Sequence, residues 1–154
     1  MMAADQSLQM QPVLLVEDDP EDVYIARRAF ERGKIPNPLR TVGDGKEALE
    51  FLERTGRYAD AQDAPRPALI LLDLNLPSVD GREVLRRIRS DPLLRLIPVV
   101  VVTTSSAESD VRACYEAGAN AYITKPTEFD SFLQAIVSVG RYWLKVAELP
   151  HEVR

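Results

Sequence analysis

The chain has 154 residues and one cysteine, is 45% hydrophobic and 28% charged, and carries a formal net charge of −5 at pH 7, which is typical of one soluble globular domain with a sizeable core. The acidic balance gives no electrostatic reason to expect nucleic acid or an anionic membrane as a partner, and no apolar run approaches the roughly 20 residues that span a bilayer. Because a lone cysteine cannot form an internal disulfide and the first residues lack the segments of a signal peptide, we expect a cytoplasmic protein.

The first predicted strand ends in a cluster of acids. Residues 1–11 are polar, and we expect them to form a flexible tail. The apolar run Val13–Val16 predicts a buried strand, and Glu17 and Asp18 follow it directly. The pair Asp19-Pro20 is suited to cap and open a helix.

A weaker strand and a second helix come next. Leu39–Val42 predicts an edge strand, and Asp44 with Glu47 has the spacing of a capping box at a helix start. The polar residues 55–67 predict a long surface loop. The helix that starts at Asp44 is predicted to have an inner face made of Ala48, Leu49, Phe51 and Leu52.

The central stretch of the chain is the apolar run 68–72, which leads straight into Asp73. An uninterrupted run this short predicts a strand that is buried on both faces, as in a parallel sheet covered by helices. Asp80 and Glu83 predict a second capping box. Residues 97–102 are another apolar run and end in Thr103.

The last third of the chain repeats this alternation. Ser105 and Glu108 predict the cap of a fourth helix, Ala121–Thr124 a short strand that leads into Lys125, and Thr127 with Asp130 the cap of a final helix. The fourth helix is predicted to bury the stripe Val111, Cys114, Tyr115 and Ala117. Five alternations of strand and helix predict an α/β fold with one doubly wound parallel sheet.

Polar side chains gather where these strands end. In a sheet whose strands had the order 2-1-3-4-5, strands one and three would be neighbours, and Glu17, Asp18 and Asp73 would converge on one crevice beside Thr103 and Lys125. Two like charges about 4 Å apart repel by roughly 4 kcal/mol at an effective dielectric near 20. A divalent cation relieves this repulsion, and an all-oxygen ligand set favours a hard ion such as Mg²⁺.

These motifs resemble the receiver domains of two-component response regulators over residues 12–146, with 147–154 left as a C-terminal tail. The matching residues are Glu17-Asp18, Asp73 with Asn75-Leu76-Pro77 and Asp80-Gly81, Thr103, Ala117-Gly118-Ala119, and Tyr122 through Lys125-Pro126. The resemblance implies the flavodoxin-like (βα)₅ fold with strand order 2-1-3-4-5.

The resemblance also implies a role for each acid. Asp73 is implied as the phosphoacceptor. Asp18, Asp73 and the backbone carbonyl of Asn75 are implied as direct ligands of Mg²⁺, and Glu17 is implied as a ligand either directly or through water.

The remaining implied roles concern the response to phosphorylation. Lys125 and the metal neutralise the phosphoryl group during transfer, and the hydroxyl of Thr103 then bonds it. Tyr122 swings inward as Thr103 moves, which remodels the face formed by helix four, strand five and helix five. The Lys125–Pro126 peptide bond is cis in this family.

Less specific features point to one subgroup of this family. The insertion at 55–67 and the end through Tyr142-Trp143-Leu144 resemble stand-alone regulators that partner bacterial phytochromes. A sensor histidine kinase is then the phosphodonor, and output passes through a protein contact, for which a homodimer is one form. The residues after Trp143 are too few for a DNA-binding module. Thr104 departs from the family pattern, which has a smaller residue there, and Glu17 is a common variant of Asp.

Two other functions remain open. An aspartyl-phosphate hydrolase would need a general acid two positions after Asp73, where this chain has Asn75. A phosphorylation-independent interaction module would keep the fold without the chemistry. Taken singly, Lys125, Thr103, Cys114, Trp143 and His151 would more often be surface or packing residues, and Tyr122 could as easily be a half-exposed strand residue as a switch.

Overall fold

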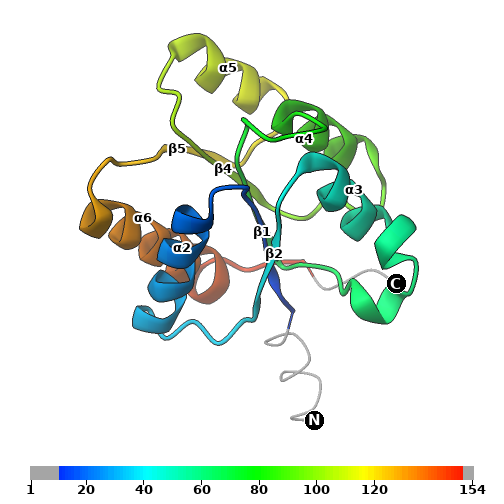
Figure 1. Cartoon of the computed structure of the whole chain (residues 1–154), viewed down its shortest axis with the longest axis horizontal. Helices are drawn as coiled ribbons and strands as arrows, with labels where there is room; N and C mark the ends of the chain where they lie inside the picture. The colour runs from blue at the N-terminus through cyan, green and yellow to red at the C-terminus, as the bar shows by residue number, and fades with distance from the viewer. Residues whose placement is uncertain (1–10, 151–154) are drawn as a thin grey trace.

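The structure, a computed structural model, describes residues 11–150 and is organised around one parallel sheet (Figure 1). Its five strands lie in the order β2-β1-β3-β4-β5, which confirms the flavodoxin-like topology. The strands are β1 (Val13–Val16), β2 (Leu39–Val42), β3 (Leu69–Leu72), β4 (Val99–Thr103) and β5 (Ala121–Thr124). The first ten residues of the predicted tail, and His151, lie outside the described residues.

Helices cover both faces of the sheet (Figure 1). One face carries α2 (Pro20–Arg32) and α6 (Phe129–Arg141). The other carries α3 (Gly45–Glu53), α4 (Gly81–Ser90) and α5 (Glu108–Glu116). Since side chains alternate across a strand, each strand contributes to both layers: in β3, Leu69 and Leu71 pack under α2 and α6, while Ile70 and Leu72 pack under α3 and α4.

The first three helices begin at the N-caps that the sequence predicts. Asp19, Asp44 and Asp80 are the N-caps of α2, α3 and α4, and the carboxylate of each accepts a backbone N–H of the first turn. Glu83 does not complete the predicted second capping box, because its carboxylate pairs with Arg86 instead.

The predicted caps of the last two helices are wrong. Ser105 does not cap α5; the N-cap is Ala107, because the Ser105 hydroxyl donates to Asp110 at 2.6 Å. Thr127 does not cap α6, which begins one residue later with Glu128 as its N-cap.

The predicted stripe of α5 is also largely wrong, because only Cys114 is buried and Tyr115 is 49% exposed. In α6, Phe132 and Ile136 are buried, and Trp143 packs against the same cluster just beyond the helix.

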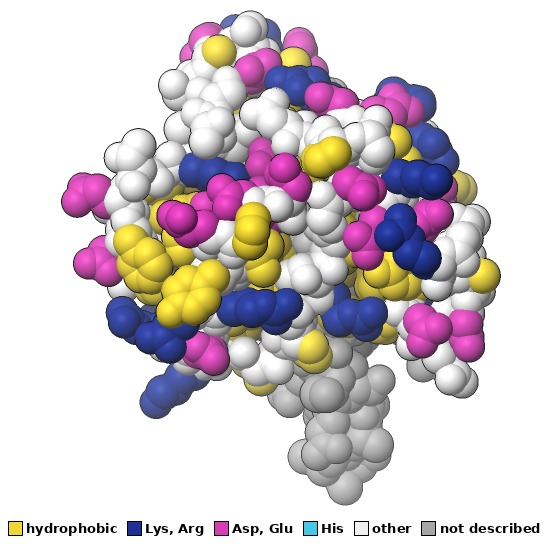
Figure 2. Space-filling model, in the orientation of Figure 1, with side chains coloured by type: hydrophobic (Ala, Val, Ile, Leu, Met, Phe, Trp, Pro, Cys, Tyr) yellow, Lys and Arg dark blue, Asp and Glu magenta, His cyan; other side chains and the backbone are white. Residues whose placement is uncertain are grey.

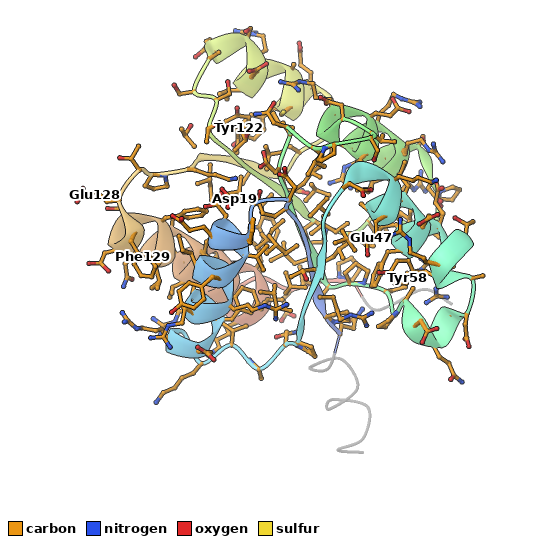
Figure 3. All side chains as sticks on the ribbon, in the orientation of Figure 1. Asp19, Glu47, Tyr58, Tyr122, Glu128 and Phe129 are labelled. Carbon is orange, nitrogen blue, oxygen red and sulfur yellow. The ribbon has the colours of Figure 1, made fainter. Side chains whose placement is uncertain are left out.

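The insertion at 55–67 lies on the surface, as predicted, but it is anchored to α3. It contains two 3₁₀ turns, η1 (Gly56–Tyr58) and η2 (Ala61–Asp63). The hydroxyl of Tyr58 donates to Glu47 at 2.7 Å, and the two side chains lie side by side in Figure 3. Ala64 is buried in the cluster beneath α3.

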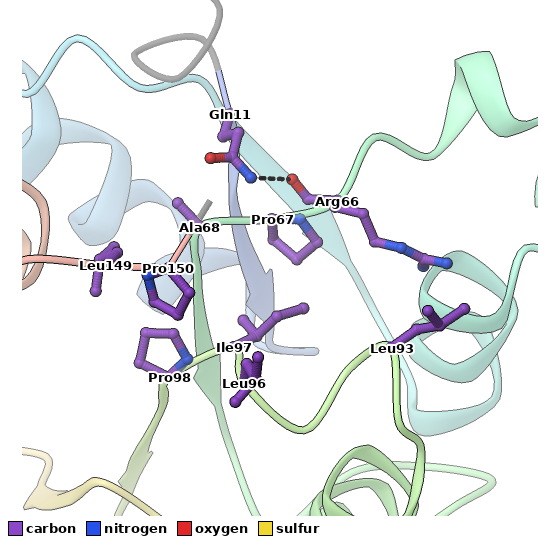
Figure 4. A pocket seen from close by; sticks show the side chains of 10 residues that line it. All are labelled: Gln11, Arg66, Pro67, Ala68, Leu93, Leu96, Ile97, Pro98, Leu149 and Pro150. Atoms are coloured by element: carbon purple, nitrogen blue, oxygen red, sulfur yellow. Dashed lines mark hydrogen bonds between the residues drawn. The ribbon is translucent and has the colours of Figure 1, made fainter. Parts of the chain in front are cut away.

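The last described residues lie at the end of the sheet opposite to the acids. A π-helical turn, η3 (Tyr142–Val146), leads to a segment in which Leu149 and Pro150 line a small apolar pocket with Ala68 and Pro98 (Figure 4). Gln11 borders this pocket and donates to the carbonyl of Arg66 at 3.4 Å. No helix within residues 11–150 is both long and apolar enough to cross a bilayer.

Candidate functional site

The predicted site residues come together at the carboxyl ends of the strands. Glu17 follows β1, Asp73 follows β3, Thr103 ends β4 and Lys125 follows β5. Acidic side chains gather on this side of the molecule near the start of α2 (Figure 2). The parallel topology explains this gathering, because every strand of a parallel sheet delivers its last residue to the same edge.

The ammonium group of Lys125 lies at the centre of the site. Its Nζ donates to Glu17 Oε1 at 2.7 Å, to Asp22 Oδ2 at 2.8 Å and to Asp73 Oδ2 at 2.9 Å. The side chains of Lys125, Glu17 and Asp73 are 7%, 4% and 8% exposed, so these contacts are shielded from water. Charged side chains are this deeply buried only when they are paired.

Burial and pairing shift the pKa values of Glu17 and Lys125. Burial raises the pKa of the Glu17 carboxyl to about 7, although the contact with Lys125 acts in the opposite direction. Burial by itself lowers the pKa of Lys125, but its hydrogen bonds to Asp22, Glu17 and Asp73 outweigh it and hold that pKa above its usual value. Lys125 is therefore a permanent positive charge at neutral pH.

The acids also fit a divalent cation. Glu17, Asp18 and Asp73 each offer a carboxylate oxygen, and these oxygens lie within 4.8 Å of one another. Glu17 and Asp73 are buried and Asp18 is exposed, so the cluster has an open side. A set of hard oxygen donors at this spacing suits Mg²⁺ or Mn²⁺ better than a softer metal.

Thr103 has an unsatisfied hydroxyl at this edge of the sheet. Its side chain is fully buried, and Oγ1 has no hydrogen-bond partner among residues 11–150. Buried hydroxyls nearly always have a partner, so an orphaned one at a site of charged groups points to a ligand atom that it would bond.

The two predicted switch residues are connected through the loop after β4. The hydroxyl of Tyr122, a half-buried residue, donates to the backbone carbonyl of Ser105 at 2.7 Å. Ser105 follows Thr103 by two residues. A movement of Thr103 would therefore displace Tyr122, because the short segment between Thr103 and Ser105 is hydrogen-bonded to it.

A groove of about 290 Å³ opens beside the site. It runs between the start of α2, where Figure 3 labels Asp19, and the start of α6, where it labels Glu128 and Phe129. Thr104 and Lys125 form its inner wall. Thr104 is exposed there.

Sequence reasoning missed one residue of the site and misjudged one peptide bond. Asp22 was not among the predicted site residues, yet it accepts a hydrogen bond from Lys125; its place in the first turn of the helix that follows the acidic pair was the available signal. The Lys125–Pro126 bond is trans, so the expectation of a cis bond is wrong. The trans isomer is the intrinsically favoured one even before proline, by about 0.5–1 kcal/mol.

Comparisons with known proteins agree with this geometry. The family profile described as the response regulator receiver domain matches residues 13–137. The response regulator Rcp1 of Synechocystis sp. is 41% identical over 147 residues, which cover 96% of this chain and 98% of Rcp1. The structure of the Mn(2+)-bound form of Rcp1 has a TM-score of 0.85 and covers 92% of this chain and 99% of that one.

Two phytochrome response regulators of known structure are also similar. The phosphorylated cyanobacterial protein RcpA is 43% identical, with a TM-score of 0.86 over 92% of this chain and 99% of RcpA. The bacteriophytochrome response regulator RtBRR is 48% identical, with a TM-score of 0.73 over 92% of this chain and 84% of RtBRR. Buried carboxylates around a strand-end lysine and the match over nearly the whole chain lead to one conclusion: this chain belongs to the family of response regulator receiver domains.

Proposed function

We propose that Asp73 accepts a phosphoryl group from a sensor histidine kinase and that the phosphorylated chain signals through a protein–protein surface. The observation that carries this proposal is the arrangement around Asp73. Its carboxylate lies 2.9 Å from the Lys125 ammonium, and Glu17 and Asp18 offer further oxygens within 4.8 Å. One oxygen nucleophile thus lies beside the positive charge and the cation ligands that phosphoryl transfer needs.

Each residue has a part in this proposal. Glu17, Asp18, Asp73 and the carbonyl of Asn75 would hold Mg²⁺, which when bound neutralises charge on the phosphoryl oxygens. Lys125 supplies a fixed positive charge to the same oxygens, and Thr103 donates its free hydroxyl to one of them after transfer.

The proposed switch links Thr103 to Tyr122 through Ser105. Engagement of the Thr103 hydroxyl would pull on the Ser105 segment and so on Tyr122, which would change the face formed by α5, β5 and α6. We propose this face as the output surface, with a second copy of the chain as its partner.

We propose a phytochrome-type kinase as the phosphodonor. The support is the similarity to RcpA and RtBRR, which are themselves named as phytochrome and bacteriophytochrome response regulators. We also propose a cytoplasmic location, a receiver unit spanning 12–146, and catalysis limited to the chain's own phosphorylation and dephosphorylation.

The test is modification by a small phosphodonor. With acetyl phosphate and Mg²⁺, intact-protein mass spectrometry should show the addition of one phosphoryl group, and the Asp73→Asn variant should show none. An unmodified wild-type protein would favour the phosphorylation-independent interaction module. Continued turnover of small phosphate esters beyond one equivalent would favour the hydrolase instead.

A further inference from the structure

The loop that follows Asp73 is attached to the start of α3. Residues 73–80 connect β3 to α4 and include Asn75, a proposed cation ligand. At the far side of this loop the carbonyl of Pro77 accepts a hydrogen bond from the N–H of Gly45 at 3.2 Å. Next to it, the Oγ of Ser78 accepts one from the N–H of Lys46 at 3.1 Å.

These two N–H groups belong to the first turn of α3, where a helix has no carbonyl of its own to satisfy them. The N-cap Asp44 satisfies the next N–H, that of Glu47, at 2.8 Å. The loop thus completes the capping of a helix that lies elsewhere in the sequence. In return, the helix fixes the position of the loop.

The Ser78 hydroxyl makes two hydrogen bonds, one as acceptor and one as donor. Besides accepting from Lys46, it donates to Asp44 Oδ1 at 3.2 Å. Its backbone has a φ of +64°, in the left-handed region that residues other than glycine rarely adopt. The hydroxyl contacts therefore hold the chain in a conformation that serine would not choose by itself.

Gly45 lets the loop approach α3 closely. A Cβ added at this residue would lie 1.9 Å from the carbonyl oxygen of Val79 and 2.7 Å from its carbonyl carbon. Both are backbone atoms, so the loop would have to move away. At Gly43, two residues earlier, an added Cβ would meet no atom within 4 Å, so this glycine provides a matched control.

The other end of the loop is tied to the site itself. The N–H of Asn75 donates to Asp73 Oδ1 at 3.2 Å, and the N–H of Gly81 donates to the carbonyl of Leu74 at 2.9 Å. Only a few residues separate these bonds from the contacts at α3. A displacement at Ser78 therefore changes where Asn75 lies relative to the carboxylates.

We propose that Ser78 and Gly45 are positioning residues of the cation site: they clamp the loop after Asp73 onto α3 and so present Asn75 to the bound ion. This inference rests on the proposed function, because it concerns the same cation. A clamp with a merely structural role would stabilise the fold but leave the Mg²⁺ affinity of the folded protein unchanged.

The test is the Mg²⁺ dissociation constant, measured by isothermal titration calorimetry at a temperature where every variant is folded. Ser78→Ala removes both hydroxyl contacts and should weaken binding about tenfold, the lower end of the loss seen when a supporting group outside the metal ligands is removed. Ser78→Gly removes the same contacts but adopts a positive φ without strain, so it should weaken binding equally with a smaller loss of stability.

Three further variants sharpen the result. Ser78→Asn should bind Mg²⁺ like the wild type, because its amide offers both a donor and an acceptor and asparagine tolerates the left-handed region. Gly45→Ala should weaken binding while Gly43→Ala does not. Ser90→Ala, which removes an exposed hydroxyl bonded to the carbonyl of Arg87 at the other end of α4, should have no effect.

The wild-type protein and the Asp18→Ala variant separate this inference from the proposed function. A wild type that does not bind Mg²⁺, or that binds it equally well without Asp18, would overturn the proposed cation site. If the wild type binds at the acids but Ser78→Ala and Ser78→Gly bind as tightly as it does, the site stands and the positioning role is wrong.

Discussion

Lys125 is the residue on which the electrostatics of the site depend. Its single ammonium group contacts three carboxylates, those of Glu17, Asp22 and Asp73, in a largely buried position. The lysine offsets part of the cost of burying these carboxylates. The same arrangement favours the binding of a cation, because three carboxylates surround a single ammonium group.

Replacing Lys125 with Met should therefore destabilise the protein. Removing one partner from a buried ionic cluster typically costs about 3–5 kcal/mol of unfolding free energy, because the remaining charges are left uncompensated. Urea unfolding without metal measures this loss, and millimolar Mg²⁺ should recover part of it by binding only the folded state. Lys46→Met, at an exposed position, is the control; equal effects of the two changes would contradict the role given to Lys125.

Asp18 should matter for the metal and not for the fold. Its side chain is exposed, so Asp18→Ala should leave the protein folded while abolishing the rise in thermal stability that Mg²⁺ produces. Differential scanning calorimetry with and without the ion tests this. Asp130→Ala, at another exposed acid, should keep the full response, and a response that survives in Asp18→Ala would mean that the ion binds elsewhere.

Among the elements, α4 is held in place by an arginine that the sequence did not single out. The guanidinium of Arg89 donates to the carbonyls of Gly118, Arg95 and Ile97 and to the side chain of Asn120, at 2.7–3.0 Å. Asn120 in turn accepts the N–H of Val99 at 2.8 Å. One side chain thus joins the end of α4 to the loops that enter β4 and β5.

Arg89→Lys should lower the unfolding free energy by about 1–3 kcal/mol, because a single ammonium cannot reach all of these acceptors and leaves carbonyls unsatisfied. Arg86→Lys is a matched control on the same helix. Arg86 forms an exposed pair with Glu83, so its replacement should change stability by less than about 0.5 kcal/mol. Equal urea midpoints for the two variants would show that the Arg89 contacts are not stabilising.

For the molecule as a whole, the two ends of the sheet have different characters. The carboxyl ends of the strands carry the charged site, and the opposite end carries the apolar pocket closed by Leu149 and Pro150 (Figure 4). On the flank, α5 buries only Cys114 and leaves Tyr115 exposed. A helix packed this loosely can shift at little cost, which suits an output surface that changes on phosphorylation.

We expect acetyl phosphate and Mg²⁺ to shift the protein from monomer to dimer in sedimentation velocity experiments. Tyr115→Glu should suppress this shift, because it places a charge on the proposed contact face. Tyr24→Glu introduces the same charge on α2, at a tyrosine that is 55% exposed, and should leave the shift intact. A phosphorylated wild type that remains monomeric would remove the homodimer from the proposal and leave a different protein as the partner.

Local patterns in the sequence were enough to predict the alternation of strands and helices, the burial of the central strands and the gathering of Glu17, Asp73, Thr103 and Lys125 at one edge. An apolar run sets each strand, and parallel pairing sets the edge at which its last residue lies. N-caps were predictable where the acid bonds its own helix, as at Asp19, Asp44 and Asp80.

Which groups touch one another depended on the folded chain. Asp22 accepts a hydrogen bond from Lys125, 103 positions away in the chain. The Ser105 hydroxyl donates to Asp110 instead of capping α5, and its carbonyl accepts from Tyr122. The contact of Ser78 with α3 joins residues more than thirty positions apart in the chain, so no local pattern reveals it. Contacts of this kind depend on how elements pack, and packing is a property of the whole fold.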